Sequence, residues 1–246
     1  MEYRHRTYRK MIHGKGMVSF PVSFKESDLW ISVDEESYSP QLKKTAYNYL
    51  VALREQLEDY ILRDQEFQRA LIPHHLLPAA PRIARLMAAA AKRAGVGPMA
   101  AVAGAVAEML GRQLTGSVKE VIVENGGDIY FNTSHPIKVG IFAGKSPLSG
   151  KVGIKIPPQP SGGGVCTSSA TVGPSLSFGQ ADAAVVISTS AALADAAAST
   201  LGNLVHCEKD FTLALQKVCK IRGVKGAVVI LGEHLGALGD VELIAL

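Results

Sequence analysis

The sequence predicts an α+β protein in which helices cover one side of an antiparallel-rich sheet, forming two layers. Predicted strands follow one another in runs, and predicted helices are grouped between these runs instead of alternating with single strands. A hydrophobic fraction of 47% and a charged fraction of 20% indicate a folded core and exclude a disordered chain. The 246 residues fit one large domain or two small, closely packed ones, and we expect a single domain over residues 1–246.

The chain begins with two predicted strands and a long helix. Alternating apolar residues predict a strand over 18–24 and, after a polar turn, a second one over 29–33. Ser39 and Pro40 predict the start of a helix, because serine caps free backbone amides and proline has none to satisfy. Apolar residues at three- and four-residue spacing then predict an amphipathic helix that reaches Ile61.

A proline-flanked loop over 73–78 precedes two alanine-rich helices, over 80–94 and 98–114. His74 and His75 lie in this loop. A zinc-binding helix would place a glutamate beside such histidines, and none is present. We therefore interpret them as an exposed pair.

The second half of the chain is rich in predicted strands. Residues 157–164 contain three prolines and three glycines, so we expect them to lie outside regular structure. A helix-then-strand pattern near 98–124 recurs near 190–231, which suggests an internal duplication. The predicted elements are strands over 118–124, 129–131, 137–142, 152–156, 183–187, 226–231 and 240–245, with helices over 190–202 and 210–221.

Charge and cysteine content exclude several functional classes. A nucleic-acid binder usually spreads a basic face over its folded domain, whereas here the net charge of +4 is confined to the first 16 residues. Three cysteines without a C-x-x-C pair indicate neither a disulfide framework nor a zinc knuckle. Glu108 and Asp195 interrupt the long apolar windows, and no signal peptide is visible, so we expect a cytoplasmic protein without a membrane span. The N-terminal basic residues are Arg4, Arg6, Arg9, Lys10 and Lys15.

Two glycine-containing clusters are candidate ligand sites. Gly126 and Gly127 follow a predicted strand, with polar Asn125 and Asp128 on either side, and paired glycines allow either close approach of a ligand or a tight hairpin turn. Residues 161–169 combine three glycines, including Gly163 and Gly164, with the hydroxyls of Thr167, Ser168 and Ser169. Free amides and hydroxyls in such a loop suit a phosphate, although glycine-serine runs also serve as flexible linkers.

A third cluster lies on the alanine-rich helix predicted over 190–202. Asp195 and Ser199 are four residues apart and therefore share one helical face, with Thr200 beside them. A carboxylate and a hydroxyl suit a hard cation, because magnesium takes few protein oxygens in addition to substrate phosphates. The same aspartate could equally be a surface residue.

Taken in order, the three clusters resemble those of the ApbE superfamily. Its members carry Gly-Gly-Asp after a strand, Thr-Ser-Ser after a glycine loop, and Ala-Asp followed four residues later by Ser or Thr. The best-known members are FAD:protein FMN transferases. The resemblance covers roughly Gly95 to Asn203 and is nearest to a shorter cytoplasmic branch, in which runs similar to 164–169 and 176–179 recur. It implies a T-fold-like architecture.

The resemblance also implies roles for individual residues. In the transferases, the third motif holds Mg²⁺ at the FAD pyrophosphate, a hydroxyl of an acceptor protein attacks the phosphorus, and AMP leaves. By position, Asp195 with Ser199 or Thr200 would be the metal ligands. Residues 126–128 would lie beside the flavin, and residues 167–169 near the phosphates.

Two functional hypotheses from different classes follow. The first is a magnesium-dependent enzyme that acts on a flavin or another nucleotide pyrophosphate, as an FMN transferase or an FAD pyrophosphatase. The second is a non-catalytic protein that binds a flavin or phosphometabolite. It rests on the absence of the His-Ile-Ile-Asp-Pro-like segment that the transferases carry, since no histidine lies between Ser169 and Ala183. The partners we expect are a small nucleotide or flavin and, for a transferase, a protein acceptor, with neither nucleic acid nor membrane.

Overall fold

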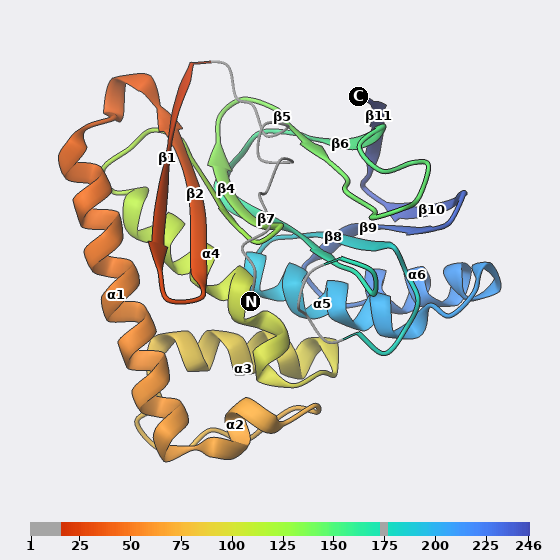
Figure 1. Ribbon diagram of the computed structural model, residues 1–246, viewed down its shortest axis with the longest axis horizontal. Helices are drawn as coiled ribbons and strands as arrows, with labels where there is room; N and C mark the ends of the chain where they lie inside the picture. The colour runs from red at the N-terminus through yellow and green to blue at the C-terminus, as the bar shows by residue number, and fades with distance from the viewer. Residues whose placement is uncertain (1–15, 173–176) are drawn as a thin grey trace.

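A computed structural model describes residues 16–172 and 177–246, so the basic residues Arg4 to Lys15 lie outside the described part of the chain. One large antiparallel sheet dominates the fold (Figure 1). Its eight strands pair in the order β1-β2-β3-β4-β7-β8-β9-β10. They are β1 Met17–Phe24, β2 Ser27–Asp34, β3 Val121–Asn125, β4 Asp128–Thr133, β7 Gln159–Ser168, β8 Ala183–Ser188, β9 Val224–Leu231 and β10 His234–Gly239.

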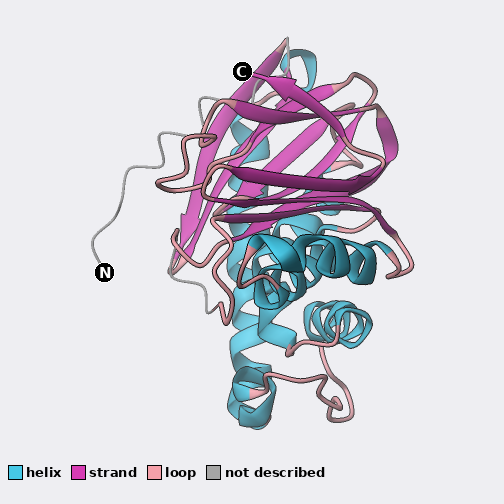
Figure 2. Cartoon of the chain, turned by 90° about the vertical axis from the view of Figure 1, so that its right-hand side faces the viewer, coloured by secondary structure: helices cyan, strands magenta, loops and turns pink. Residues whose placement is uncertain are grey.

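The helices gather on one side of this sheet (Figure 2), which confirms the predicted α+β class. The predicted cap at Ser39 is present, because its Oγ accepts a hydrogen bond from Leu42 N at 3.2 Å. The helices are α1 Pro40–Arg63, α2 Gln65–Arg69, α3 Arg82–Ala94, α4 Val102–Leu114, α5 Ala191–Leu204 and α6 Phe211–Cys219, with short 3₁₀ segments η2 Glu35–Ser37, η3 Pro98–Ala101 and η4 Glu208–Asp210.

A second, three-stranded sheet covers the other face and adds a third layer to the predicted two. It consists of β5 Ile137–Gly140, β6 Val152–Ile156 and β11 Glu242–Ala245, paired in the order β11-β6-β5. Successive side chains of a strand point to opposite faces. Ile122 and Phe131 therefore pack with the second sheet, whereas Val123 and Tyr130 pack with the helices.

Strand β7 corrects the expectation that residues 157–164 lie outside regular structure. The glycines of this segment join the sheet, with Phe131 opposite Gly163 and Tyr130 opposite Gly164. The register between β4 and β7 shifts just before this point, between Phe131 and Thr133. Pro160 lies in that irregular stretch, where its missing N–H costs no ladder hydrogen bond. A bulge thus allows a Pro-Gly segment to act as a strand.

Other differences between expectation and structure are smaller. Neither α2 nor β10 is predicted by the residue pattern, and the helix expected over 98–114 begins with the 3₁₀ turn η3. The suggested internal duplication is not confirmed and stays a prediction. Within the described residues, no single helix is long and apolar enough to cross a membrane. Helix α3 with η3 and α4 passes that test only as a pair bent by 102°.

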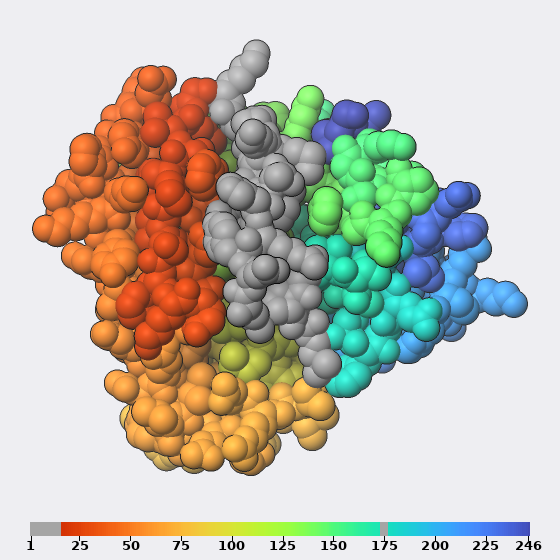
Figure 3. All heavy atoms as spheres, in the orientation of Figure 1, coloured from red at the N-terminus to blue at the C-terminus, as the bar shows by residue number. Residues whose placement is uncertain are grey.

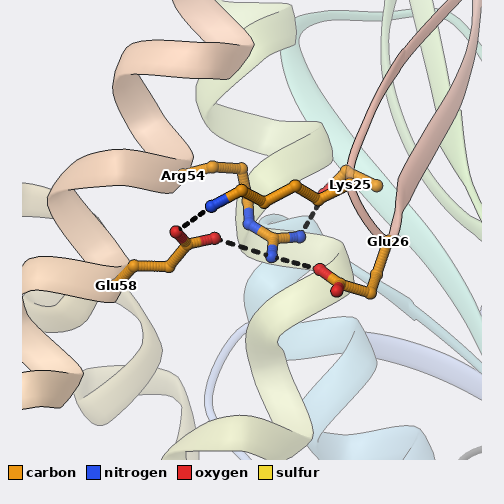
Figure 4. Close-up of polar contacts among 5 residues, drawn as sticks. Lys25, Glu26, Arg54 and Glu58 are labelled. Atoms are coloured by element: carbon orange, nitrogen blue, oxygen red, sulfur yellow. Dashed lines mark hydrogen bonds and ion pairs between the residues drawn. The ribbon is translucent and has the colours of Figure 1, made fainter.

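A polar network attaches the β1–β2 turn to α1 (Figure 4). The Arg54 guanidinium donates to Ser27 Oγ at 2.8 Å, Glu26 Oε2 at 2.6 Å and Glu58 Oε1 at 3.1 Å. Lys25 also pairs with Glu58. In the space-filling view, the β1–β2 hairpin and α1 accordingly form one continuous flank, drawn in red and orange (Figure 3).

Candidate functional site

The first predicted cluster forms the two-residue turn between β3 and β4. Gly126 and Gly127 have φ values of 71° and 104°, a conformation that favours glycine, so the hairpin interpretation is confirmed. Asn125 Nδ2 donates to the Ala103 carbonyl at 3.1 Å and holds the turn against the start of α4. A Cβ at Gly127 would have no heavy atom within 4 Å, so the backbone there borders open space.

Asp128 begins β4 directly after the turn and lies in the interior, 8% exposed. The pairing of Ile129 with Val165 places Cys166 of β7 next to Asp128. The Cys166 side chain hydrogen-bonds to Asp128, and its Sγ lies 3.3 Å from the Ala191 carbonyl of α5. Burial and then the negative charges of Asp128 and Asp195 raise the pKa of the Cys166 thiol, which keeps it protonated and unreactive.

Asp195 of α5 lies near Asp128 and Cys166, on the helical side of the sheet. Its Oδ2 accepts a hydrogen bond from Gly104 N of α4 at 2.9 Å. Part of the residue reaches solvent, but protein atoms crowd the carboxylate. Burial and then the charge of Asp128 raise the pKa of Asp195 well above its ordinary value, while the amides of Gly104 and Ala103 oppose this rise. Two carboxylates from distant parts of the sequence thus interact electrostatically.

Ser199 and Thr200, the other predicted metal ligands, lie in different surroundings. Ser199 follows Asp195 by one turn of α5, shares its face and is partly exposed. Thr200 is buried, and its Oγ1 donates to the Ala94 carbonyl of α3 at 2.8 Å. Thr200 therefore ties α5 to α3, and Ser199 is the hydroxyl available beside Asp195.

The glycines of the second cluster pack instead of forming the predicted phosphate nest. A Cβ at Gly164 would lie 2.2 Å from Ala191 Cα, and one at Gly163 would lie 2.8 Å from Phe131 Cζ. Both residues lie in β7. Gly164 allows α5 to approach the sheet closely, and Gly163 leaves room for the Phe131 ring of the neighbouring strand. Their proposed contact with a ligand stays a prediction.

The hydroxyl residues of the second cluster lie at the end of β7. Ser169 Oγ accepts hydrogen bonds from the amides of Thr171 at 3.1 Å and Val172 at 2.9 Å, which shapes the following loop. Ser168 is buried and faces Gly202 of α5, whereas Thr167 is partly exposed. Side chains alternate along β7, so Thr167 points with Val165 toward the second sheet, whereas Cys166 points toward the helices. The first and third clusters therefore meet on the helical face of the sheet, where β4 begins, and the Thr167 hydroxyl lies on the opposite face.

Two important residues were missed by sequence reasoning. A Cβ at Gly104 would lie 2.3 Å from the Ala191 carbonyl and 2.8 Å from Asp195 Cβ, so only glycine lets α4 cross α5 here. Glu108 is buried, and its Oε2 accepts hydrogen bonds from Ser190 Oγ at 2.6 Å and Ala192 N at 3.2 Å. It caps the start of α5. The sequence signal that pointed to Glu108 was its position as a single acidic residue in an alanine-rich helix.

The oxygen donors of Asp128, Asp195 and Ser199 fit magnesium. In the described residues, no group of three or more His, Cys, Asp or Glu side chains is arranged to hold a metal. Two carboxylates and a hydroxyl are nevertheless hard oxygen donors, and Mg²⁺ usually takes one or two carboxylates together with water and substrate phosphates. A divalent cation would also relieve the repulsion between Asp128 and Asp195. We call these two aspartates and Ser199 the carboxylate site.

Comparison with known proteins places the chain in a family. A model of the family described as "AbpE bacteria" matches residues 9–236. The chain belongs to the ApbE-like superfamily. The UPF0280 protein of Methanocella arvoryzae is 44% identical over 208 residues, which cover 84% of this chain and 83% of the relative. The UPF0280 protein of Methanosphaerula palustris is 43% identical over 226 residues, 92% of each chain.

Solved structures share the fold of this ApbE-like protein. The apo flavinyl transferase ApbE of Pseudomonas stutzeri aligns with a TM-score of 0.54 at 15% identity, over 91% of this chain and 94% of that one. The ApbE protein of Thermotoga maritima aligns with a TM-score of 0.56 at 11% identity, over 89% and 96%. At this level of identity the likeness establishes the architecture, and function must be argued from the site.

Proposed function

We propose that this ApbE-like protein binds a flavin nucleotide through its pyrophosphate at the carboxylate site, with Mg²⁺, and acts as an FMN transferase or an FAD pyrophosphatase. The observation that supports this most is the pair Asp128 and Asp195, which the fold holds together although their repulsion raises the pKa of Asp195. The flavin transferases among its structural neighbours agree with this choice of ligand. For a transferase, the second substrate would be an acceptor protein.

The chain's own residues would bind and orient the nucleotide. Asp195 and Ser199 would hold the metal from α5, and Asp128 would add charge from β4. The open backbone at Gly127 would lie beside the flavin. When bound, Mg²⁺ would neutralise charge on the pyrophosphate and make phosphorus more susceptible to attack.

The alternative proposal is a flavin or phosphometabolite binder without catalysis. In the described residues, His74, His135 and His234 pair with carboxylates outside the carboxylate site. The Cys166 thiol there is buried and protonated. Among residues 16–172 and 177–246, the site therefore offers carboxylates and hydroxyls for binding, but neither an imidazole nor a thiolate to assist proton transfer.

Incubation with FAD and Mg²⁺ distinguishes the proposals. We expect FAD to raise the melting temperature in the presence of Mg²⁺ and much less in EDTA. Release of AMP, measured by chromatography, would support the enzyme, and binding without AMP would support the binder. If FAD neither binds nor changes the melting temperature with Mg²⁺, both proposals are wrong.

A matched pair of variants locates the effect. Asp195→Asn removes one charge from the carboxylate site with little change in shape, and should abolish the Mg²⁺-dependent response to FAD. Asp59→Asn makes the same change at an exposed position on α1 and should respond as wild type. An unchanged response in Asp195→Asn would remove Asp195 from the binding site.

A further inference from the structure

A cavity lies where α1, α3 and α4 meet strands β4 and β7. Its volume is about 260 Å³. Among the described residues, its lining contains two arginines, two tyrosines and several amide and hydroxyl groups, but no carboxylate. The cavity is on the helical side of the sheet, because Tyr130 lines it and packs with the helices. In Figure 1, α4 lies between α1 and α5. This concentration of donors distinguishes it from the carboxylate site.

The two guanidinium groups come from different helices. Arg82 is the first residue of α3, is exposed, and forms no ion pair within residues 16–172 and 177–246. Arg112 of α4 donates its Nε to Glu108 at 2.9 Å, which leaves its two terminal nitrogens for other partners. The buried Glu108 thus orients Arg112, and Arg82 adds a second positive charge.

Two glycines make room for the tyrosine ring that forms one wall of the cavity. A Cβ at Gly111 would lie 2.1 Å from Tyr130 Cδ1, and one at Gly162 would lie 2.6 Å from Tyr130 Oη. The Tyr130 ring therefore occupies a slot that only glycines leave open. The Arg112 guanidinium lies over the same ring, 5.9 Å from its centroid. A fixed phenol beside a fixed guanidinium is a preorganised polar surface.

We infer that this cavity binds a small phosphate monoester, with Arg82 and Arg112 on the phosphate and the amides and hydroxyls on a polar body. Arginine forks match phosphate oxygens in geometry and charge. Donors that reach the cavity from α3, α4 and two strands suit a tetrahedral group with three terminal oxygens better than a planar carboxylate. The volume is slightly below the roughly 300–1,000 Å³ of drug-sized sites, which suits a sugar phosphate rather than a dinucleotide.

This cavity is separate from the carboxylate site. Gly104, which contacts Asp195, and Arg112 are eight residues apart on α4, a rise of about 12 Å. The inference therefore goes beyond the proposed function, and each can fail without the other.

Titration calorimetry with ribose 5-phosphate tests the inference, in low-salt buffer free of phosphate. We expect saturable binding of one ligand per chain, with weaker binding of inorganic phosphate and none of ribose. Arg82→Gln should weaken the sugar phosphate at least ten-fold. Arg69→Gln makes the same change at an exposed position of α2 and should bind as wild type. Both sites are exposed, so we expect both variants to fold, and melting curves check this.

Several outcomes would overturn the inference. The inference is wrong if ribose 5-phosphate gives no saturable heat, or if it binds Arg82→Gln as tightly as wild type. Citrate binding more tightly than the sugar phosphate would assign the cavity to carboxylates. Loss of the binding in Asp195→Asn would place the ligand at the carboxylate site. Binding that persists in that variant supports a second, independent site.

Discussion

Asp64 and Asp195 are both crowded carboxylates of the helical layer, but their surroundings differ. Asp64, at the end of α1, accepts hydrogen bonds from Tyr60 Oη at 2.7 Å, Phe67 N at 3.3 Å and His74 Nε2 at 3.0 Å. Burial would raise its pKa, but the hydrogen bonds from Tyr60 and His74 outweigh burial and lower it. The pKa of Asp195 is instead raised by burial and by the charge of Asp128.

The difference separates a structural carboxylate from a candidate binding one. The donors around Asp64 tie α1, α2 and the loop that follows them together, so its charge stabilises the fold. Asp195 receives backbone amides on one side but faces a like charge on the other, so its charge costs stability unless a cation is bound. Opposite effects of mutation should therefore distinguish the two sites.

The largest expected effect is at Asp64. Asp64→Ala leaves the Tyr60 hydroxyl and the Phe67 amide without their acceptor, and should destabilise the protein by about 3–5 kcal/mol. Urea unfolding followed by circular dichroism measures this. Asp59→Ala, on the exposed side of the same helix, should stay within about 0.5 kcal/mol of wild type. Equal effects in the two variants would contradict a structural role for Asp64.

The next effect is at the helix crossing that positions Asp195. Gly104→Ala places a Cβ against the Ala191 carbonyl and should destabilise the protein by about 1–3 kcal/mol. It should also weaken the Mg²⁺-dependent response to FAD, because α5 must move away from α4. Gly116→Ala is the control, since a Cβ there would meet nothing within 4 Å. The crossing would not need glycine if both variants melted alike.

A smaller effect of opposite sign is expected at Asp195. In metal-free buffer, Asp195→Asn should stabilise the protein by about 1 kcal/mol, because the neutral amide removes repulsion with Asp128 and still accepts the Gly104 N–H. For a chain of this length, the melting temperature should rise by about 2–4 °C. Scanning calorimetry in EDTA measures it. A lower melting temperature would show that the two carboxylates do not repel each other significantly.

The smallest expected effect is the pH dependence at Asp64. Its pKa is lower in the folded protein than its ordinary value of 3.8. The stabilisation is therefore fully present above that value and is lost as pH falls through the lower, folded-state pKa. The difference in unfolding free energy between wild type and Asp64→Asn should stay constant above about pH 5 and narrow below about pH 4. A difference that is unchanged down to pH 3 would contradict the lowered pKa.

Local patterns predicted much of the fold but little of the site's geometry. The cap at Ser39, the apolar spacing of α1 and the turn at Gly126 and Gly127 are local features, and each is present. Strand β7 could not be predicted, because its pairing depends on a bulge opposite β4. The pairing of His74 with Asp64 likewise corrects the expectation of an exposed histidine pair, since ten residues of chain separate the partners. His75 is exposed, as expected.

By itself, the sequence determined the α+β class, most helices and strands, and the resemblance to the ApbE superfamily, because periodicity, caps and motifs are written in neighbouring residues. The tertiary structure decided which of the candidate residues act together. It places Asp128 near Asp195 and directs the Thr200 hydroxyl to α3. It also places Gly163 and Gly164 where a side chain would clash with neighbouring atoms. Contacts between α4, α5 and the sheet join residues up to 91 positions apart, and their distances depend on the packing of whole elements.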